Sequence, residues 1–144
     1  MDQDDILFGE TDDASAICGV RRPEWLTRHH IDGNPDHDTY DNKIVLCHNC
    51  HNQHNQNKGL TREAIETRKR HLIFKTLTQY GVSALKIARR NNFGVVGMPF
   101  LLYHLVGLGY LTQEETQMTY GEVEVTVRFA ITPAGRDLVD RWLS

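Results

Sequence analysis

The chain has 144 residues and a formal net charge of −3, and this length suits one ordinary domain or two small ones. No apolar run reaches the roughly eighteen residues of a membrane span, and the first residues carry acids where a secretory signal carries bases. We therefore expect neither a membrane partner nor export. The three cysteines cannot all pair, and two of them form Cys47-x-x-Cys50, so we expect a reducing, cytoplasmic setting.

Charge is distributed unevenly along the chain. Residues 1–13 contain six acidic and no basic residues, and we treat them as an acidic N-terminal lead. Residues 61–92 contain eight Lys and Arg against two Glu. Such a basic run is either a solvated helix face or a contact surface for phosphates. The candidate nucleic-acid-binding residues in it are Arg68, Lys69, Arg70, Arg89 and Arg90.

The first half of the chain has the pattern of two strands followed by two helices. Residues 25–31 and 43–46 predict strands, and the segment between them is rich in turn residues. A short helix is expected over about 47–59, where a glycine is a good stop. A longer helix is predicted over 61–80, because a threonine cap is followed by apolar residues at helical spacing.

The second half has a different pattern. Helices are predicted over 83–92 and 99–109, two strands within 110–132, and a closing helix over 133–143. The residues of the second strand expected to alternate inward are Val123, Val125, Val127 and Phe129. Residues 65–144 resemble the winged helix-turn-helix family in the run from LVGLGYLTQ to ITPAGRDLVDRWL. The resemblance implies an α+β chain whose C-terminal part, 61–144, is a winged-helix domain.

Residues 28–59 are dense in side chains that can bind a metal. They hold six of the eight histidines and two of the three cysteines. His51, His54 and Asn55 share one face of the short helix, so a strand and a facing helix can close on one cation. The alternative is a set of surface histidines in a polar loop, and for His37 and His48 we expect exposure to solvent.

This segment resembles the HNH nuclease family, which has a ββα-metal fold. The matching residues are the doublet His29-His30 in RHHIDG, Asn42 in YDNKIVLC and His51 in CHNCHNQH. The resemblance implies that 14–60 is a nuclease domain, that His30 is the general base and that Asn42 braces the loop. It also implies that His29 and His51 hold the catalytic cation, with His54 or Asn55 as a further ligand.

Two metal sites follow from these residues. The catalytic cation is expected to be Mg²⁺ or Mn²⁺, and nitrogen ligands favour Mn²⁺, Ni²⁺ or Zn²⁺ over Mg²⁺. Family members often carry a structural zinc between two Cys-x-x-Cys pairs, and here Cys18, Cys47 and Cys50 are present while Ser15 replaces the fourth cysteine. Either Asp12, Asp13 or a histidine completes the site, or zinc has been lost and the thiols are simply buried.

Two functions are consistent with the sequence. The first is a metal-dependent HNH endonuclease that hydrolyses double-stranded DNA, with a winged helix that aids DNA or protein-partner binding. The second is a non-catalytic, zinc-type winged-helix regulator. A purely structural zinc module would need its cysteines more than its histidines. This chain keeps every histidine of the HNH pattern and lacks one cysteine, which favours the enzyme. The candidate recognition helix, 98–109, contains no Arg or Lys, which argues for contacts to the DNA backbone or to a protein partner and against sequence reading.

Overall fold

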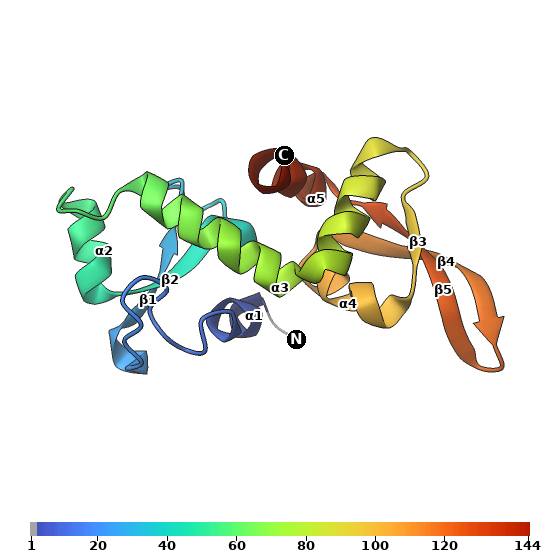
Figure 1. The fold of residues 1–144 in the computed structure, drawn as a ribbon, viewed down its shortest axis with the longest axis horizontal. Coiled ribbons are helices and arrows are strands. Elements are labelled where there is room, and N and C mark those ends of the chain that lie inside the picture. The colour runs from blue at the N-terminus through green and yellow to red at the C-terminus, as the bar shows by residue number, and fades with distance from the viewer. Residues whose placement is uncertain (1–2) are drawn as a thin grey trace. The chain divides into compact units, whose positions relative to one another are not determined.

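The computed structural model describes residues 3–144, so the first two residues of the predicted acidic lead lie outside it. The described chain is a mixed α+β protein with two small antiparallel sheets (Figure 1), and the predicted α+β class is confirmed at this level. Contacts divide the chain into two compact units, residues 1–76 and 77–144. The predicted domain boundaries at residues 13 and 60 stay predictions. None of the described helices combines the length and the apolar character that crossing a bilayer requires.

The first unit contains a two-stranded sheet followed directly by a helix. Strand β1 (Leu26–His30) pairs antiparallel with β2 (Lys43–Cys47), and all five residues of β2 are buried. Helix α2 (His48–Asn55) begins at once after β2. Its cap is Cys47, whose sulfur accepts a hydrogen bond from the Cys50 N–H at 3.4 Å. This ββα order agrees with the pattern predicted from the sequence.

Two short single turns and one helix in this unit were not predicted. The turns are η1 (Pro23–Trp25) and η2 (Tyr40–Asn42), and the helix is α1 (Gln3–Gly9), which lies within the acidic lead. Although α1 is acidic, one of its faces packs into the unit: Leu7 is fully buried, and Glu10, just after the helix, is 5% exposed. The N-terminal segment is therefore part of the core of its unit.

The span α3 (Arg62–Arg90) covers the two helices predicted over 61–80 and 83–92, and a kink at Thr78 separates its two helical parts. Thr61 caps it as predicted, since its hydroxyl accepts from the Ala64 N–H at 3.1 Å. The backbone departs from helical geometry at Thr78, where φ is 66°. Gly81 does not end the helix. A Cβ there would lie 3.1 Å from His104 Nε2, so this glycine permits close packing between helices.

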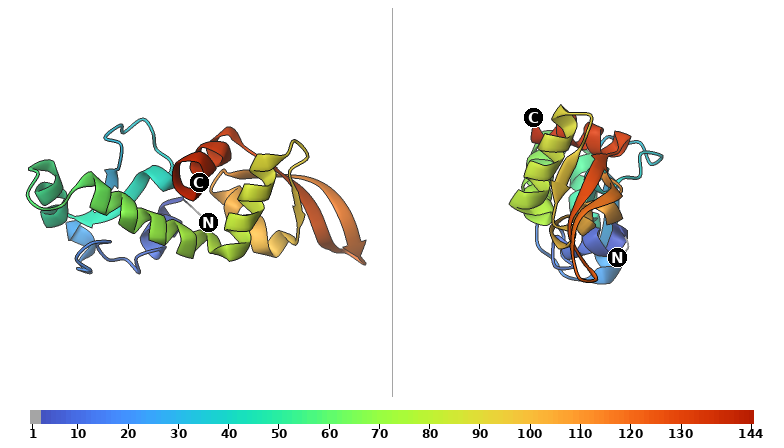
Figure 2. Two further views of the ribbon diagram at one scale, coloured as in Figure 1. Left: turned by 45° about the horizontal axis from the view of Figure 1, so that its top comes forward. Right: turned by 90° about the vertical axis from the view of Figure 1, so that its right-hand side faces the viewer.

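The second unit contains a three-stranded sheet in the order β3-β5-β4. Strand β3 (Val95–Gly97) was not predicted, and it pairs with β5 (Val123–Ile131), which also pairs with β4 (Leu111–Tyr120). Helix α4 (Pro99–Gly107) lies between β3 and β4 in the chain. Helix α5 (Pro133–Leu138) continues as a π-helical turn, η3 (Val139–Leu143). Figure 2 shows the β4–β5 hairpin from two further directions.

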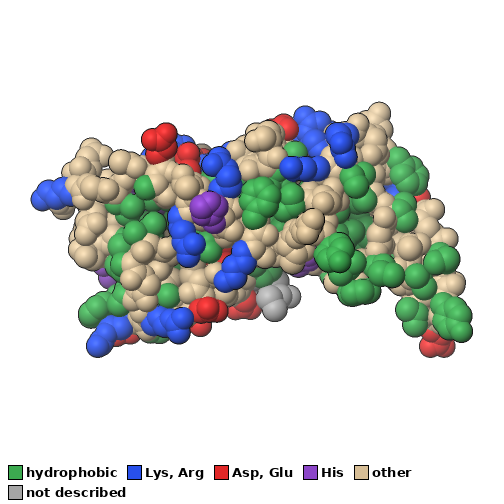
Figure 3. Space-filling model, in the orientation of Figure 1, with side chains coloured by type: hydrophobic (Ala, Val, Ile, Leu, Met, Phe, Trp, Pro, Cys, Tyr) green, Lys and Arg blue, Asp and Glu red, His purple; other side chains and the backbone are tan. Residues whose placement is uncertain are grey.

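The hairpin is buried at one end and exposed at the other. Val127 and Phe129 are fully buried, as predicted for inward positions of β5. Val123 is not inward, because it is 63% exposed beside the turn, and Tyr120 is 83% exposed. Hydrophobic side chains are visible at the far end of the hairpin in Figure 3. The reason is geometric: a strand that extends past its packing partners has no core to face.

Candidate functional site

Strand β1 directs the two adjacent histidines to opposite faces of the small sheet, as the alternation of a strand requires. His29 is 8% exposed and lies against helix α2. His30 is half-buried and lines a cavity on the other face, and its register partner in β2 is Lys43. The two imidazoles therefore have different environments, and each can have its own role.

Three histidine rings converge between β1 and α2. His29 Nδ1 lies 3.3 Å from His51 Nε2, and the ring centroids of these residues are 4.9 Å apart. The ring of His54 lies 4.9 Å from that of His29 on the same side. Two nitrogens that each lie about 2.05 Å from a tetrahedral cation are about 3.3 Å apart, so the His29–His51 spacing fits two ligands of one ion.

The hydrogen bonds of His51 fix its tautomer. Its Nδ1 lies 3.3 Å from the hydroxyl of Thr27, and that hydroxyl donates its own hydrogen to the Leu46 carbonyl at 3.0 Å. The hydroxyl must then accept from His51, which places the proton on Nδ1. The lone pair is left on Nε2, the nitrogen that faces His29.

His54 has the same arrangement. Its Nδ1 lies 3.0 Å from the Leu60 carbonyl oxygen, which can only accept, so Nδ1 carries the proton and Nε2 the lone pair. Oxygen acceptors that orient an imidazole in this way are typical of metal ligands. The other nitrogen of His29, Nε2, is buried and has no hydrogen-bond partner. The cluster thus contains one buried nitrogen that makes no hydrogen bond within the protein.

Burial favours the uncharged form of His29 and of His51. Desolvation, with smaller contributions from the nearby His51 and His54, lowers the pKa of His29 from its ordinary 6.5 to about 4. Burial also lowers the pKa of His51. Neutral imidazoles are the form that binds metal, and the lowered pKa values of His29 and His51 favour that form near neutral pH.

The other candidate residues on and near α2 lie outside the cluster of His29, His51 and His54. Asn55 is exposed at the end of the helix, and it is His54 that packs against His29. His48 is exposed, in agreement with its predicted exposure. His37 is half-buried instead, since its Nδ1 lies 2.6 Å from Asp32 Oδ2. This hydrogen bond is the main cause that lowers the pKa of the Asp32 carboxyl.

Asn42 holds the loop that follows His30. Its side chain is fully buried in the turn η2. The Oδ1 accepts from the Asp32 N–H at 3.2 Å, and the Nδ2 donates to Asp32 Oδ1 at 2.9 Å and to the His37 carbonyl at 2.8 Å. These bonds restrain residues 31–39, and that geometry agrees with the bracing role expected for this residue.

His30 borders a cavity of about 890 Å³. Its Nε2 lies 3.0 Å from Asp38 Oδ1, and the same oxygen lies 3.1 Å from the ammonium of Lys43. The hydrogen bonds from His30 and Lys43 lower the pKa of the Asp38 carboxyl. The imidazole is therefore oriented by a carboxylate that is itself held by a buried cation.

Three thiols form a second cluster. The ligand atoms of Cys18, Cys47 and Cys50 all lie within 4.8 Å of one another, and the first two sulfurs are 3.5 Å apart. Cys47 and Cys50 are buried and Cys18 is exposed. Sulfurs bound at about 2.3 Å to a tetrahedral ion are about 3.8 Å apart, so these three cysteines could bind a metal such as zinc.

The fourth position beside the thiols is a hydroxyl. Ser15 is buried, and its Oγ lies 3.8 Å from the Cys50 sulfur. Within residues 3–144 no carboxylate or histidine joins the three thiols, so the expectation that Asp12 or Asp13 completes the set has no support. Desolvation raises the pKa of Cys18, but hydrogen bonds from Val20, Ser15 and Cys47 outweigh it and lower that pKa to about 7.

The basic candidates have unequal exposure. Lys69 is fully buried and paired with Glu10, so the prediction that it contacts a phosphate is wrong. Arg68 is exposed, with its Nε donating to the Ala16 carbonyl at 2.9 Å, and Arg70 is exposed as well. In the second unit Arg90 is exposed, whereas the Nε of Arg89 lies 3.2 Å from the carboxylate of Asp140. The exposed arginines remain candidate phosphate contacts.

No family model, curated protein or solved structure matches this chain. The features that a function has to explain are therefore those of the molecule itself. They are the histidine cluster (His29, His51 and His54), the thiol cluster (Cys18, Cys47 and Cys50) and the cavity beside His30.

Proposed function

We propose that this chain is a metal-dependent HNH-type endonuclease that hydrolyses phosphodiester bonds of DNA. The observation that carries the proposal is the orientation of His51 and His54. Each imidazole donates Nδ1–H to a protein oxygen, and its ring centroid lies 4.9 Å from that of His29. A merely structural pair of surface histidines would not need both rings fixed in the same tautomer around a third, buried imidazole.

The histidine cluster is the proposed site of the catalytic cation. His29, His51 and His54 would hold it, and as a neutral nitrogen set they favour Mn²⁺, Ni²⁺ or Zn²⁺ over Mg²⁺. A divalent cation there would stabilise negative charge on the scissile phosphate and on the leaving oxygen. Three protein ligands leave coordination positions for substrate, which a catalytic site requires.

His30 is the proposed general base. Its Nε2 is bonded to Asp38, so Nδ1 is the nitrogen left to take a proton from the attacking water. Asn42 supports this role indirectly, because its side chain is hydrogen-bonded to Asp32 and to the His37 carbonyl in the loop that carries Asp38. The half-buried position beside a cavity gives the imidazole access to a substrate. Because His30 and the cation site lie on opposite faces of the sheet, one phosphate would meet both past the end of β1, where His30 is the last residue.

Residues 77–144 are proposed to form a winged-helix domain. The sheet order β3-β5-β4, the long β4–β5 hairpin and the helix that follows it support this interpretation. Helix α4 has no Arg or Lys, so its contacts would be to the DNA backbone or to a protein partner. Exposed Phe100 and Tyr103 on that helix favour a partner with an apolar surface.

A second candidate function is a non-catalytic, zinc-type DNA-binding regulator. The thiol cluster favours it, because three close sulfurs hold a fold together without any chemistry. The two candidates differ in what they require of the histidines. A regulator needs the thiols and tolerates loss of His30, whereas an endonuclease loses its activity without that imidazole.

Plasmid nicking by the full chain tests the proposal. Supercoiled DNA is incubated with protein and Mg²⁺, Mn²⁺, Ni²⁺ or Zn²⁺, with EDTA as the metal-free arm. We expect nicking that EDTA abolishes and that His30→Ala reduces by about 10³-fold, within the range of general base loss and its coupled steps. His48→Ala is the matched control, since His48 is exposed on α2, and it should cleave like the unmodified chain. Equal cleavage by both variants would remove His30 from the mechanism.

A further inference from the structure

The cavity beside His30 carries two cations on the face of the sheet that the histidine cluster does not use. Arg28 precedes His30 by two residues on β1, so both side chains leave the same face of the strand. Lys43 stands opposite His30 in the register of β1 and β2. All three residues line the cavity. One imidazole and two basic groups therefore face one space of about 890 Å³, together with the Asp38 carboxylate that pairs with His30 and Lys43.

One carboxylate from helix α1 pairs with Arg28 and also lies near Lys43, whose closer partner is Asp38 Oδ1 at 3.1 Å. Asp4 Oδ2 pairs with Arg28 Nη1, and Asp4 Oδ1 lies 3.6 Å from Lys43 Nζ. The two oxygens of a single acidic group thus reach two different basic groups. The two non-bridging oxygens of a phosphodiester carry the same single negative charge and can make the same bridge.

The rest of the cavity suits the organic part of a nucleotide. Phe8, Leu26 and Pro35 give it an apolar wall, and Gln3 and Thr27 add polar groups. A sugar or a base next to a bound phosphate needs contact of this mixed kind. Inorganic anions would use the cations but would leave this wall uncovered.

We propose that this cavity binds one phosphodiester group of a DNA strand between Arg28 and Lys43, and that Asp4 occupies the same position in the free protein. The ligand class rests on the proposed function, since it is a strand of DNA brought to His30. Asp4 is displaced when the strand enters. The acidic N-terminal segment is then a built-in competitor of nucleic acid, which accounts for a carboxylate between two cations at the mouth of the site.

The first arm of the test removes one cation. Binding of a short fluorescein-labelled duplex to the full chain is measured by anisotropy in EDTA, so that no cleavage occurs. Arg28→Gln should weaken binding by about tenfold, the loss expected for a charged contact to phosphate. Arg21→Gln makes the same charge change at an exposed position in the same unit and should stay within about twofold. Equal effects of the two variants, or no binding by the unmodified chain, would overturn the proposal.

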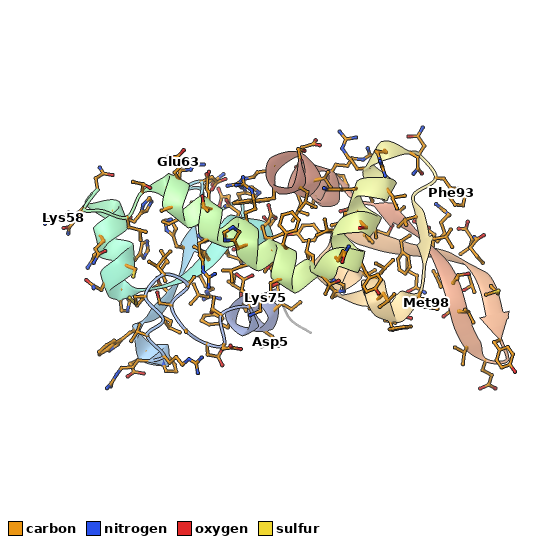
Figure 4. The ribbon with its side chains drawn as sticks, viewed as in Figure 1. Asp5, Lys58, Glu63, Lys75, Phe93 and Met98 are labelled. Atoms are coloured by element: carbon orange, nitrogen blue, oxygen red, sulfur yellow. The ribbon has the colours of Figure 1, made fainter. Side chains whose placement is uncertain are left out.

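The second arm removes the competitor. Asp4→Asn should bind the duplex about three- to tenfold more tightly than Asp5→Asn, because the two variants change net charge equally and Asp4 is the residue that contacts the cations. Asp5, labelled in Figure 4, lies on the same helix and is exposed. If Asp4→Asn instead binds more weakly than Asp5→Asn, then Asp4 serves to orient Arg28 and the proposed displacement is wrong.

Cleavage in Mn²⁺ separates this inference from the proposed function. Binding differences as predicted, with no metal-dependent nicking by the unmodified chain, would leave the phosphate site in place and remove the nuclease. Nicking that requires His30, with Arg28→Gln and Arg21→Gln binding alike, would leave the nuclease in place and remove this phosphate site.

Discussion

The ammonium of Lys69 donates to Glu10 Oε1 at 2.8 Å, and both side chains are fully buried. The same ammonium lies 3.8 Å from the ring centroid of Tyr40, whose hydroxyl donates to the other oxygen of Glu10. Lys75, labelled in Figure 4, adds a contact at 3.4 Å from its Nζ to the Glu10 carbonyl. This network joins the end of α1, the turn η2 and helix α3 within the first unit.

Loss of the lysine should destabilise the first unit strongly. Lys69→Ala leaves the Glu10 carboxylate buried beside Tyr40 without its cation, and removal of one partner of a buried pair costs about 3–5 kcal/mol. Urea unfolding at neutral pH, followed by circular dichroism, measures the free energy. Arg70→Ala removes the same charge from the neighbouring exposed position and should cost less than about 1 kcal/mol.

A double variant shows whether the cost comes from the unpaired carboxylate. Lys69→Met combined with Glu10→Gln removes both charges and should recover at least half of the loss. A double variant as unstable as Lys69→Ala would mean that packing, and not charge, dominates at this position.

The burial of Lys69 shows what the sequence could have predicted. Ile65 and Ile73 are four residues before and after it, so Lys69 lies on the apolar face of α3, and helical spacing alone contained that signal. The adjacent Arg68 and Arg70 favour the other interpretation, a basic surface. The partner could not be predicted, because Glu10 is 59 residues away in the chain and lies next to a short acidic helix with no clear periodicity.

The candidate sites also contain features that the sequence predicts and features that it does not. The spacing of His29, His51 and His54 predicted that they converge, because a strand, its neighbour and the following helix fix the positions of those residues. The position of Asp4 beside His30 could not be predicted, since it depends on how α1 packs. Strand β3 was missed because a three-residue strand has too few residues to show alternation.

Replacement of Asn42 by aspartate should disrupt the loop after His30. The Nδ2 donates to two oxygens, Asp32 Oδ1 and the His37 carbonyl, and a carboxylate at this fully buried position would face both as an acceptor. We expect a loss of at least about 2 kcal/mol in urea unfolding and a parallel loss of nicking activity.

Asn34→Asp is the control for the loop. The Asn34 Oδ1 accepts from the Asp36 N–H at 3.0 Å, and an aspartate can make that bond equally well. This variant should stay within about 0.5 kcal/mol of the unmodified chain. If both variants lose stability equally, added negative charge in the loop is the cause and the donor role of Asn42 is not.

The histidine cluster should make stability depend on pH. Folding lowers the pKa of His29 from 6.5 to about 4 and lowers that of His51 in the same direction, so the unfolded chain binds more protons than the folded chain between these values. Stability from these groups is therefore present above pH 6.5 and is lost as the pH falls toward about 4. Urea midpoints of metal-free protein, measured across this range, should fall with pH.

His29→Gln isolates the contribution of this imidazole, because glutamine is polar, of similar size and does not titrate. The variant should show a shallower fall of the midpoint between pH 6.5 and about 4 than the unmodified chain. His48→Gln, at an exposed position on α2, should keep the original slope. Identical slopes for all three proteins would assign the pH dependence to other groups.

Ser15→Cys should complete the thiol cluster. Ser15 is buried with its Oγ 3.8 Å from the Cys50 sulfur, so a cysteine there places a fourth thiol beside Cys18, Cys47 and Cys50. Zinc prefers four such ligands, and a hydroxyl is a poor substitute for a thiolate. Competition with a chromogenic chelator should show at least about tenfold tighter zinc binding than the unmodified chain, and zinc should raise the melting temperature further.

The spectrum of bound Co²⁺ identifies the ligands in the same variant. Ser15→Cys should give stronger thiolate-to-metal absorption than the unmodified chain, because a fourth sulfur joins a tetrahedral site. Ser83→Cys adds a thiol at an exposed position in the second unit and should change neither the zinc affinity nor the spectrum. Cys47→Ser in the Ser15→Cys background should return the affinity to the level of three thiols, since it removes one buried sulfur from the set. Zinc affinity that is the same in the Ser15→Cys and Ser83→Cys proteins would mean that position 15 does not supply a metal ligand.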